Sequence, residues 1–188
     1  MQGVVRTDLT FPHTWKTEVL RVRPLILPPR HFVYPLQVDE VERGALEVLI
    51  QPSAADPFLA TCALGFHDPI VPTGIWSTPN PDALCAMSGG YGYIIETTAP
   101  ERFTMLPYRP VFQVHTAVEA GLLLFVGHQA ILAWGNHGEA WQSKRLSDEG
   151  ITVTSIEGRV LYGLGWNMIT DKETPFALDL DNGQLLKK

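Results

Sequence analysis

The chain has 188 residues, of which 45% are apolar and 18% are charged, and its formal net charge at pH 7 is −6. This length is enough for one domain with a buried core, or for two small ones. Residues 1–110 hold 8 basic and 11 acidic side chains, and residues 111–188 hold 6 and 9, so neither part is basic. Nucleic acid and anionic membranes are therefore not expected as partners, because both are bound through clusters of lysine and arginine.

The sequence also carries no sign of export or membrane insertion. Its first residues, MQGVVRTDLTFPHTW, lack a basic region followed by an apolar core, so no secretory signal is predicted. The longest near-apolar run, residues 121–135, is too short to cross a bilayer and has His128 in its middle. Cys62 and Cys85 form no CxxC motif, which favours buried reduced thiols. A cytoplasmic protein is the expectation.

Prolines divide the chain, since fourteen of the fifteen lie in residues 1–110. Proline lacks a backbone donor and is excluded from central strands, so this part is predicted to hold short extended segments and loops. Its clearest strand pattern is HFVYPLQV, residues 31–38, in which alternate residues share a face. The best helical candidate, residues 38–49, is interrupted by Gly44, so no long helix is predicted.

Strand patterns continue through the rest of the chain. In residues 91–98, Tyr91, Tyr93 and Ile95 alternate onto one face, and LLLFV and AILAW, residues 122–126 and 130–134, are apolar throughout. Unbroken apolar runs of this length are typical of strands covered on both faces. Residues 160–166 can lay the row from Val160 through Tyr162 to Trp166 on a core, because side chains alternate along a strand.

A repeat of about forty residues links these strands. Residues 84–106 and 123–146 share an outline of strand, glycine-containing turn, strand, polar loop and third segment, with an offset of 39 to 40 residues. Residues 151–166 repeat the strand–turn–strand portion, with IEGR at the turn. This period, with three or four short strands in each repeat, is the size of a β-propeller blade.

The segment 84–186, in which GLGW is followed by PFALDLDNG, resembles blades of β-propellers and similar repeated β-meanders. It looks closest to small uncharacterised bacterial all-β proteins of this kind. The resemblance implies antiparallel β-meanders, arranged as an incomplete propeller-like sheet or a twisted sandwich, and it implies no activity. We therefore predict one all-β domain over residues 1–188, with propeller-like repeats in 73–188 and extended, Pro-rich segments of 1–72 packed on them.

Candidate catalytic residues are few. His67 stands beside Asp68, but adjacent strand residues point to opposite faces, so they form no dyad unless a turn bends the chain. His137 and Glu139 lie in a glycine-rich loop downstream of His128. A catalytic zinc needs three converging ligands, and the deaminase signature needs a downstream Pro-Cys-x-x-Cys that is missing. We expect no bound metal and no cofactor.

Other motifs are better explained by structure than by chemistry. DLDNG, residues 179–183, places Gly183 at position 5 of a calcium loop that needs it at position 6, whereas Asn-Gly is a strong turn signal. No Gly-x-Ser-x-Gly motif or phosphate-binding loop is present in the sequence. Four aromatic residues either fill the core or line a ligand pocket: Trp76, Trp134, Trp141 and Trp166.

Two functional classes remain. A non-enzymatic binding or protein-interaction module is favoured by the low charge density and by the lack of a catalytic constellation. The alternative is a hydrolase whose site is assembled from histidine, aspartate and glutamate residues in loops. A short meander leaves open strand edges, so a homodimer is also predicted unless segments such as HFVYPLQV cover those edges within the chain.

Overall fold

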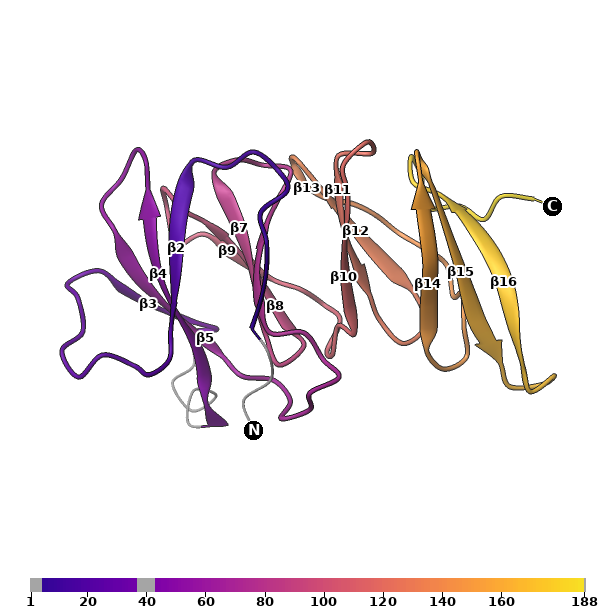
Figure 1. The fold of residues 1–188 in the computed structure, drawn as a ribbon, viewed down its shortest axis with the longest axis horizontal. Helices are drawn as coiled ribbons and strands as arrows, with labels where there is room; N and C mark the ends of the chain where they lie inside the picture. The colour runs from indigo at the N-terminus through magenta and orange to yellow at the C-terminus, as the bar shows by residue number, and fades with distance from the viewer. Residues whose placement is uncertain (1–4, 37–42, 188) are drawn as a thin grey trace. The chain divides into compact units, whose positions relative to one another are not determined.

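The computed structural model describes residues 5–36 and 43–187, and it is essentially all-β, with 51% strand and 1% helix. Its four sheets are mostly antiparallel, and within the described ranges none closes into a barrel (Figure 1). The predicted fold class is therefore confirmed. The chain divides into two compact units, Met1–Pro110 and Val111–Lys188, a boundary that coincides with the end of the proline-rich part. That the chain forms one domain stays a prediction.

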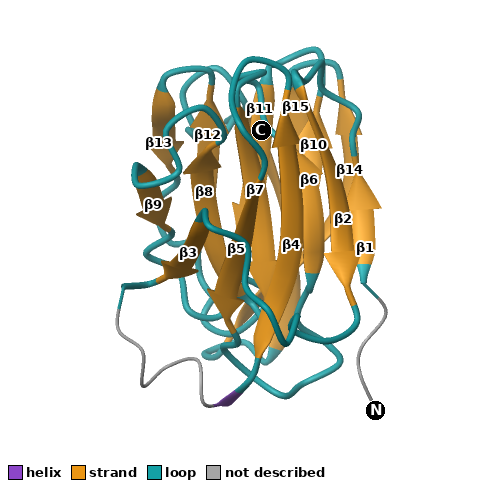
Figure 2. Ribbon diagram, turned by 90° about the vertical axis from the view of Figure 1, so that its left-hand side faces the viewer, coloured by secondary structure: helices purple, strands orange, loops and turns teal. Residues whose placement is uncertain are grey.

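The described residues of the first unit form two sheets. Sheet A has the strand order β1 (Arg6–Asp8), β6 (Gly74–Ser77), β7 (Ala83–Ser88), β8 (Tyr91–Glu96) and β9 (Phe103–Met105). Sheet B has the order β2 (Trp15–Leu20), β4 (Ala45–Pro52), β5 (Phe58–Ala63) and β3 (His31–Tyr34) (Figure 2). β1 and β3 pair in parallel with β6 and β5. N-terminal segments therefore form the outermost strand on one side of each of these two sheets.

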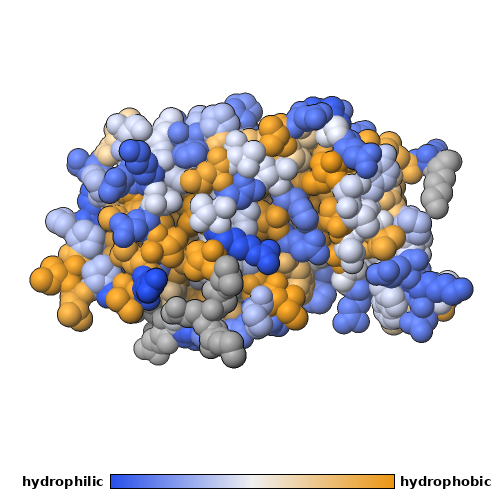
Figure 3. Space-filling model, in the orientation of Figure 1, coloured by the Kyte–Doolittle hydropathy of each residue, from blue (hydrophilic) through white to orange (hydrophobic). Residues whose placement is uncertain are grey.

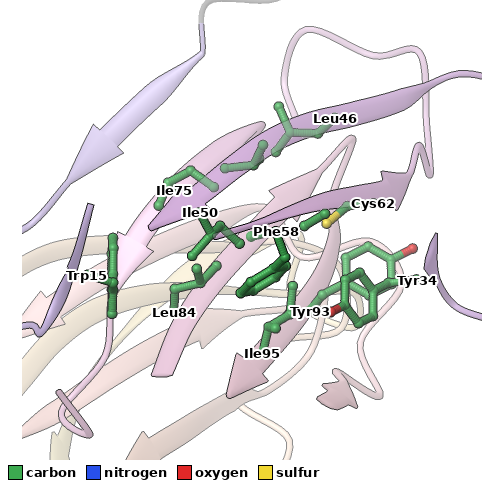
Figure 4. Close-up of a cluster of buried hydrophobic side chains, with 13 residues drawn as sticks. Trp15, Tyr34, Leu46, Ile50, Phe58, Cys62, Ile75, Leu84, Tyr93 and Ile95 are labelled. Carbon is green, nitrogen blue, oxygen red and sulfur yellow. The ribbon is translucent and has the colours of Figure 1, made fainter. Parts of the chain in front are cut away.

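The core of the first unit lies between sheets A and B, where alternate residues of their strands meet (Figure 4). Phe58 is fully buried among them, and Tyr34 and Tyr93 are buried beside it. The Tyr34 hydroxyl donates to the carbonyl of Pro100 at 2.7 Å and the Tyr93 hydroxyl to that of Ala63 at 3.0 Å. Both phenols therefore bury their rings without leaving a polar group unsatisfied.

The second unit is built from strands that pair in chain order. Sheet C consists of β10 (Gln113–Ala117), β11 (Leu122–Val126), β12 (Ile131–Gly135) and β13 (Gly138–Gln142). Sheet D consists of β14 (Ile151–Glu157), β15 (Val160–Asn167) and β16 (Lys172–Asp179). All five pairs are antiparallel, and every residue of β11 is buried, as the apolar run predicted. The repeated outline is also found, as β7–β8–β9 and β11–β12–β13.

One face of β15 differs from the sequence expectation. The strand buries Leu161, Gly163 and Gly165, whereas Tyr162 on the opposite face is 39% exposed. A Cβ added at Gly165 would lie 2.1 Å from the carbonyl oxygen of Leu146. The chain therefore packs directly against the glycines of this face, which only residues without a side chain allow at these positions.

Two further local predictions have clear outcomes. The helical candidate 38–49 is not formed where it is described, because residues 45–49 belong to β4, while residues 38–42 lie outside the described residues. The turn at 179–183 is confirmed, with Gly183 at φ +70° and a Cβ there only 2.5 Å from the ring of Trp141. Within the described part of the chain, no helix has the length and apolar character needed to cross a membrane.

Candidate functional site

The residues predicted as a possible dyad, His67 and Asp68, lie exposed in the loop after β5. His67 Nε2 donates to the carbonyl of Arg43 at 3.0 Å, and Asp68 Oδ1 accepts from the backbone N–H of Ile70 at 2.9 Å. Each side chain therefore bonds to the backbone of its surroundings. No hydrogen bond between the two is found in this described loop.

The histidines of the zinc hypothesis lie at opposite ends of one strand. His128 is in the turn before β12, where its ring contacts Phe112 edge-on at 4.3 Å between centroids. His137 is in the turn after β12, and Glu139 follows it in β13. A five-residue strand is roughly 16 Å long. His128 therefore cannot share an ion with His137 and Glu139.

The four tryptophans are dispersed. Trp76 is buried in sheet A of the first unit. In the second unit, Trp141 packs on the core and donates Nε1–H to the carbonyl of Leu180 at 2.8 Å. Trp134 follows Ala133, which faces that core, so its side chain lies on the other face of sheet C, and Trp166 lies on the less buried face of β15. The three tryptophans of the second unit do not converge on a common pocket.

A buried polar network lies on the face of sheet B that points away from the core. Glu47 of β4 and Thr61 of β5 are register partners, and Thr61 Oγ1 donates to Glu47 Oε2 at 2.5 Å. His31 Nε2, at the start of β3, lies 2.9 Å from Thr61 Oγ1. Arg23 comes from the β2–β3 loop, residues 21–30, and its Nε lies 3.8 Å from Glu47 Oε1. Three strands and one loop meet at this network.

A hydroxyl beside an imidazole and a carboxylate is a set of groups typical of nucleophilic catalysis. Here, however, Thr61 is fully buried, so its oxygen is closed to a substrate. Its hydroxyl proton is donated to Glu47, and His31 Nε2 lies 2.9 Å from Thr61 Oγ1 and 3.5 Å from Arg23 Nη2. The network is suited to fixing Glu47 and tying the β2–β3 loop to the sheet.

The electrostatics of the network favour a neutral imidazole. Burial lowers the pKa of His31, and the nearby Arg23 guanidinium lowers it further, while Glu47 acts in the opposite direction. A neutral His31 leaves the Glu47 carboxylate, which is only 6% exposed, as the anionic neighbour of Arg23. The loop is thus attached to sheet B through an ion pair of which one partner is buried.

Above this network, the β2–β3 loop presents apolar side chains to solvent. Val22, Leu25 and Ile26 are 77%, 104% and 88% exposed. Figure 3 shows hydrophobic atoms at the lower left, where Figure 1 places this loop. The loop contains three arginines and no acidic residue. Sequence analysis did not identify it, although RVRPLILPPR carries the signal: an apolar run bracketed by prolines and arginines.

The base of the loop is held by Arg30. Its Nη1 donates to the carbonyl of Asp56 at 2.5 Å, and its guanidinium carbon lies 5.9 Å from the ring centroids of both Phe32 and Phe58. Contacts at this distance are typical of cation–π interactions. Arg23 and Arg30 therefore attach the two halves of the loop to sheet B.

The second unit contains a groove of about 530 Å³ beside β16, a size common for small-molecule sites. Leu146, Tyr162, Phe176 and Leu185 line it, together with Arg145. Arg145 Nη2 is already paired with Asp148 at 2.7 Å. Small-molecule sites usually combine apolar walls with several convergent polar groups, so this groove is a weaker candidate than the β2–β3 loop.

No protein-family model matches the chain, and no curated protein matches its sequence. Among solved structures, the chain is similar to AztD of Citrobacter koseri, with a TM-score of 0.46 and 13% identity over 76% of this chain and 43% of that one. It is similar to hydrazine synthase of Kuenenia stuttgartiensis, with a TM-score of 0.41 and 15% identity over 65% of this chain and 37% of that one.

A further similarity is to the N-terminal domain of Nup159, with a TM-score of 0.41 and 13% identity over 99% of this chain and 53% of that one. The chain thus spans about half the length of these proteins, or less. The similarity is one of β-rich architecture.

Proposed function

We propose that the protein is a non-enzymatic interaction module and that its first unit presents the contact surface. The observation that carries this proposal is the exposure of Val22, Leu25 and Ile26 on a loop whose base is fixed to sheet B. Exposed apolar patches on soluble proteins often mark interaction sites. Phe66 and Ile70, in the loop after β5 of the same unit, are 43% and 71% exposed and add to the apolar character of this unit.

The hydrolase alternative draws no support from the geometry. His67 and Asp68 bond to backbone groups, and His128 lies at the opposite end of β12 from His137. The Thr61 hydroxyl is fully buried and donates its proton to Glu47, so it is not available for nucleophilic attack on a substrate.

The cellular compartment, the partners and the oligomeric state of the protein are also proposals. We propose a cytoplasmic, bacterial protein that binds neither nucleic acid nor membranes and that forms a homodimer. Cys62 and Cys85 are both free and buried, and burial raises the pKa of each thiol, which suits inert thiols in a reducing compartment. The net charge of −6 supports the absence of a polyanionic partner.

Photo-crosslinking in cells of the source organism tests the proposed function. A benzophenone amino acid is placed singly at Leu27, at Ile70 or at Ile169, which is an exposed position of the second unit. We expect adducts of defined mass from the first-unit positions. The partner identified in such an adduct, once purified on its own, should bind the unmodified chain with a measurable affinity. Turnover of ester, phosphate or glycoside substrates that His67→Ala or His137→Ala abolishes would overturn the proposal.

A further inference from the structure

Resting on the proposed function, we infer that the β2–β3 loop inserts its apolar tip into an apolar pocket of a partner protein. The rim of that pocket carries carboxylates. Nothing in the comparisons assigns a role to this loop. The inference depends on three independent properties of the loop: the exposure of its tip, the sign of its charge and the rigidity of its base.

The tip of the loop is aliphatic. Leu25 and Ile26 are 104% and 88% exposed, so almost all of their surface is available to a partner. Two branched side chains next to each other present a convex apolar surface, which a concave pocket can cover completely. Burying such side chains supplies most of the affinity in protein association.

The charge of the loop specifies the rim of that pocket. Residues 21–30 contain three arginines and no acidic residue, in a chain whose net charge is −6. Arg23 and Arg30 are attached to sheet B, whereas Arg21 is exposed and, among the described residues, has no carboxylate within ion-pair distance. An exposed guanidinium at the root of an apolar tip is complementary to a carboxylate, with which it can form two parallel hydrogen bonds.

The loop is also prepared for binding. Pro24, Pro28 and Pro29 restrict its backbone, and Arg23 and Arg30 hold both of its halves. A loop that is already ordered loses little conformational entropy when its partner closes around it. Because little conformational entropy is lost, the β2–β3 loop can bind its partner through a small interface.

A protein partner suits these properties better than a lipid surface does. Anionic membranes are bound by clusters of several lysines and arginines close to the surface. Here two of the three arginines of the loop are engaged with sheet B, and the protein as a whole is acidic. A single guanidinium beside two aliphatic side chains matches a pocket with one or two carboxylates.

The experiment keeps the benzophenone at Leu27 and compares variants of its neighbours. Leu25→Ser combined with Ile26→Ser should lower the adduct yield by about 100-fold, since two buried aliphatic side chains are lost. Arg21→Glu should lower it by about ten-fold and Arg21→Lys should largely retain it, because a rim charge governs association. The matched control, Met168→Ser combined with Ile169→Ser in the second unit, removes two apolar side chains that are 66% and 91% exposed and should change nothing.

The supporting result is an adducted partner peptide with aspartate or glutamate near the crosslink, together with the charge dependence at Arg21. An unchanged yield in Arg21→Glu or in the double serine variant overturns the inference. So does co-sedimentation of the chain with phosphatidylglycerol vesicles that depends on Leu25 and Ile26. Adducts that form only at Ile70 overturn the inference and leave the proposed function standing. Adducts that form only at Ile169, in the second unit, or no adduct at any position overturn both.

Discussion

The two units are built from the same kind of sheet but are connected differently. Within each sheet of the second unit the strands pair in chain order and short turns join them, while residues 143–150 connect sheet C to sheet D. In the first unit β2 and β3 stand at opposite edges of sheet B, in the order β2-β4-β5-β3, although they follow each other in the chain. The connection must cross three strand spacings, roughly 14 Å. The β2–β3 loop exists because of this topology.

The protruding element of this protein lies in a crossover connection and not in a hairpin turn. Hairpin turns are short and stay close to the end of their sheet. A crossover connection is longer, so some of its residues can extend away from the sheet. Both units expose apolar side chains, since Met168 and Ile169 are 66% and 91% exposed in the β15–β16 turn. Of these two connections, the crossover alone combines such side chains with an arginine, Arg23, that is paired with a buried carboxylate.

The largest expected effect separates the cores of the two units. Phe58→Ala empties a fully buried site between sheets A and B and should lower the free energy of unfolding by about 3–5 kcal/mol. Leu124→Ala, at a fully buried site of the second unit, should lower it by about 2–5 kcal/mol. Hydrogen exchange read by mass spectrometry in urea reports on each unit separately.

If the units unfold independently, Phe58→Ala speeds exchange in residues 5–110 alone and Leu124→Ala in residues 111–187 alone. If both variants speed exchange throughout the chain, the protein unfolds as the single cooperative domain that the sequence predicted. The contrast between the units would then be one of connection and not of stability.

A second prediction concerns the glycine face of β15. Gly165→Ala places a methyl group against the carbonyl oxygen of Leu146, which is backbone and cannot move aside cheaply. We expect the free energy of unfolding to fall by about 1–3 kcal/mol. The control is Gly135→Ala in β12, where the nearest atom to the new methyl is 3.7 Å away. Equal urea midpoints for the two variants would contradict the close packing of sheet D.

The sequence predicted local structure well and long-range structure poorly. LLLFV and the Asn182–Gly183 turn follow from local rules, namely apolar runs and turn chemistry. The buried face of β15 could not be predicted, because both faces carry side chains that a core accepts, and a backbone contact with Leu146 decides between them. The placement of β3 beside β5 depends on which edge is open, which no local pattern records.

The candidate site shows the same division. Glu47 and Thr61 are 14 residues apart, and His31 and Thr61 are 30 apart, so strand register alone brings the network together. The β2–β3 loop, in contrast, was readable from its prolines and arginines. Its exposure was not, because the same aliphatic run could equally have formed a buried strand.

A third prediction tests whether the buried network distinguishes the crossover from an ordinary turn. Glu47→Gln removes the charge that Arg23 and Thr61 bind, and should lower the free energy of unfolding by about 1–2 kcal/mol. Exchange of the amides in residues 21–31 should rise more than elsewhere. Glu18→Gln, on an exposed position of neighbouring β2, serves as the control. An unchanged loop in Glu47→Gln would show that Arg30 and the prolines suffice to hold it.

The smallest expected effect concerns pH and one histidine in each unit. Burial lowers the pKa of His115, whose Nε2 donates to Gln113 Oε1 at 2.9 Å, and burial together with Arg23 lowers the pKa of His31. In both cases the unfolded chain, with its ordinary histidine pKa of 6.5, takes up protons more readily than the folded one. Stability is therefore highest above that value and falls as the pH drops below it.

Imidazole titrations by NMR should place both pKa values below 6.5, and urea midpoints at pH 7.5 and 5.5 should differ by less in His31→Gln and in His115→Gln than in the unmodified chain. Arg23→Gln removes the second cause at His31 only, so it should raise that pKa and leave the pKa of His115 unchanged. A pKa of His31 that does not respond would mean that burial alone sets it. Arg23 would then have no electrostatic influence on His31, and burial would be the cause of the lowered histidine pKa in both units.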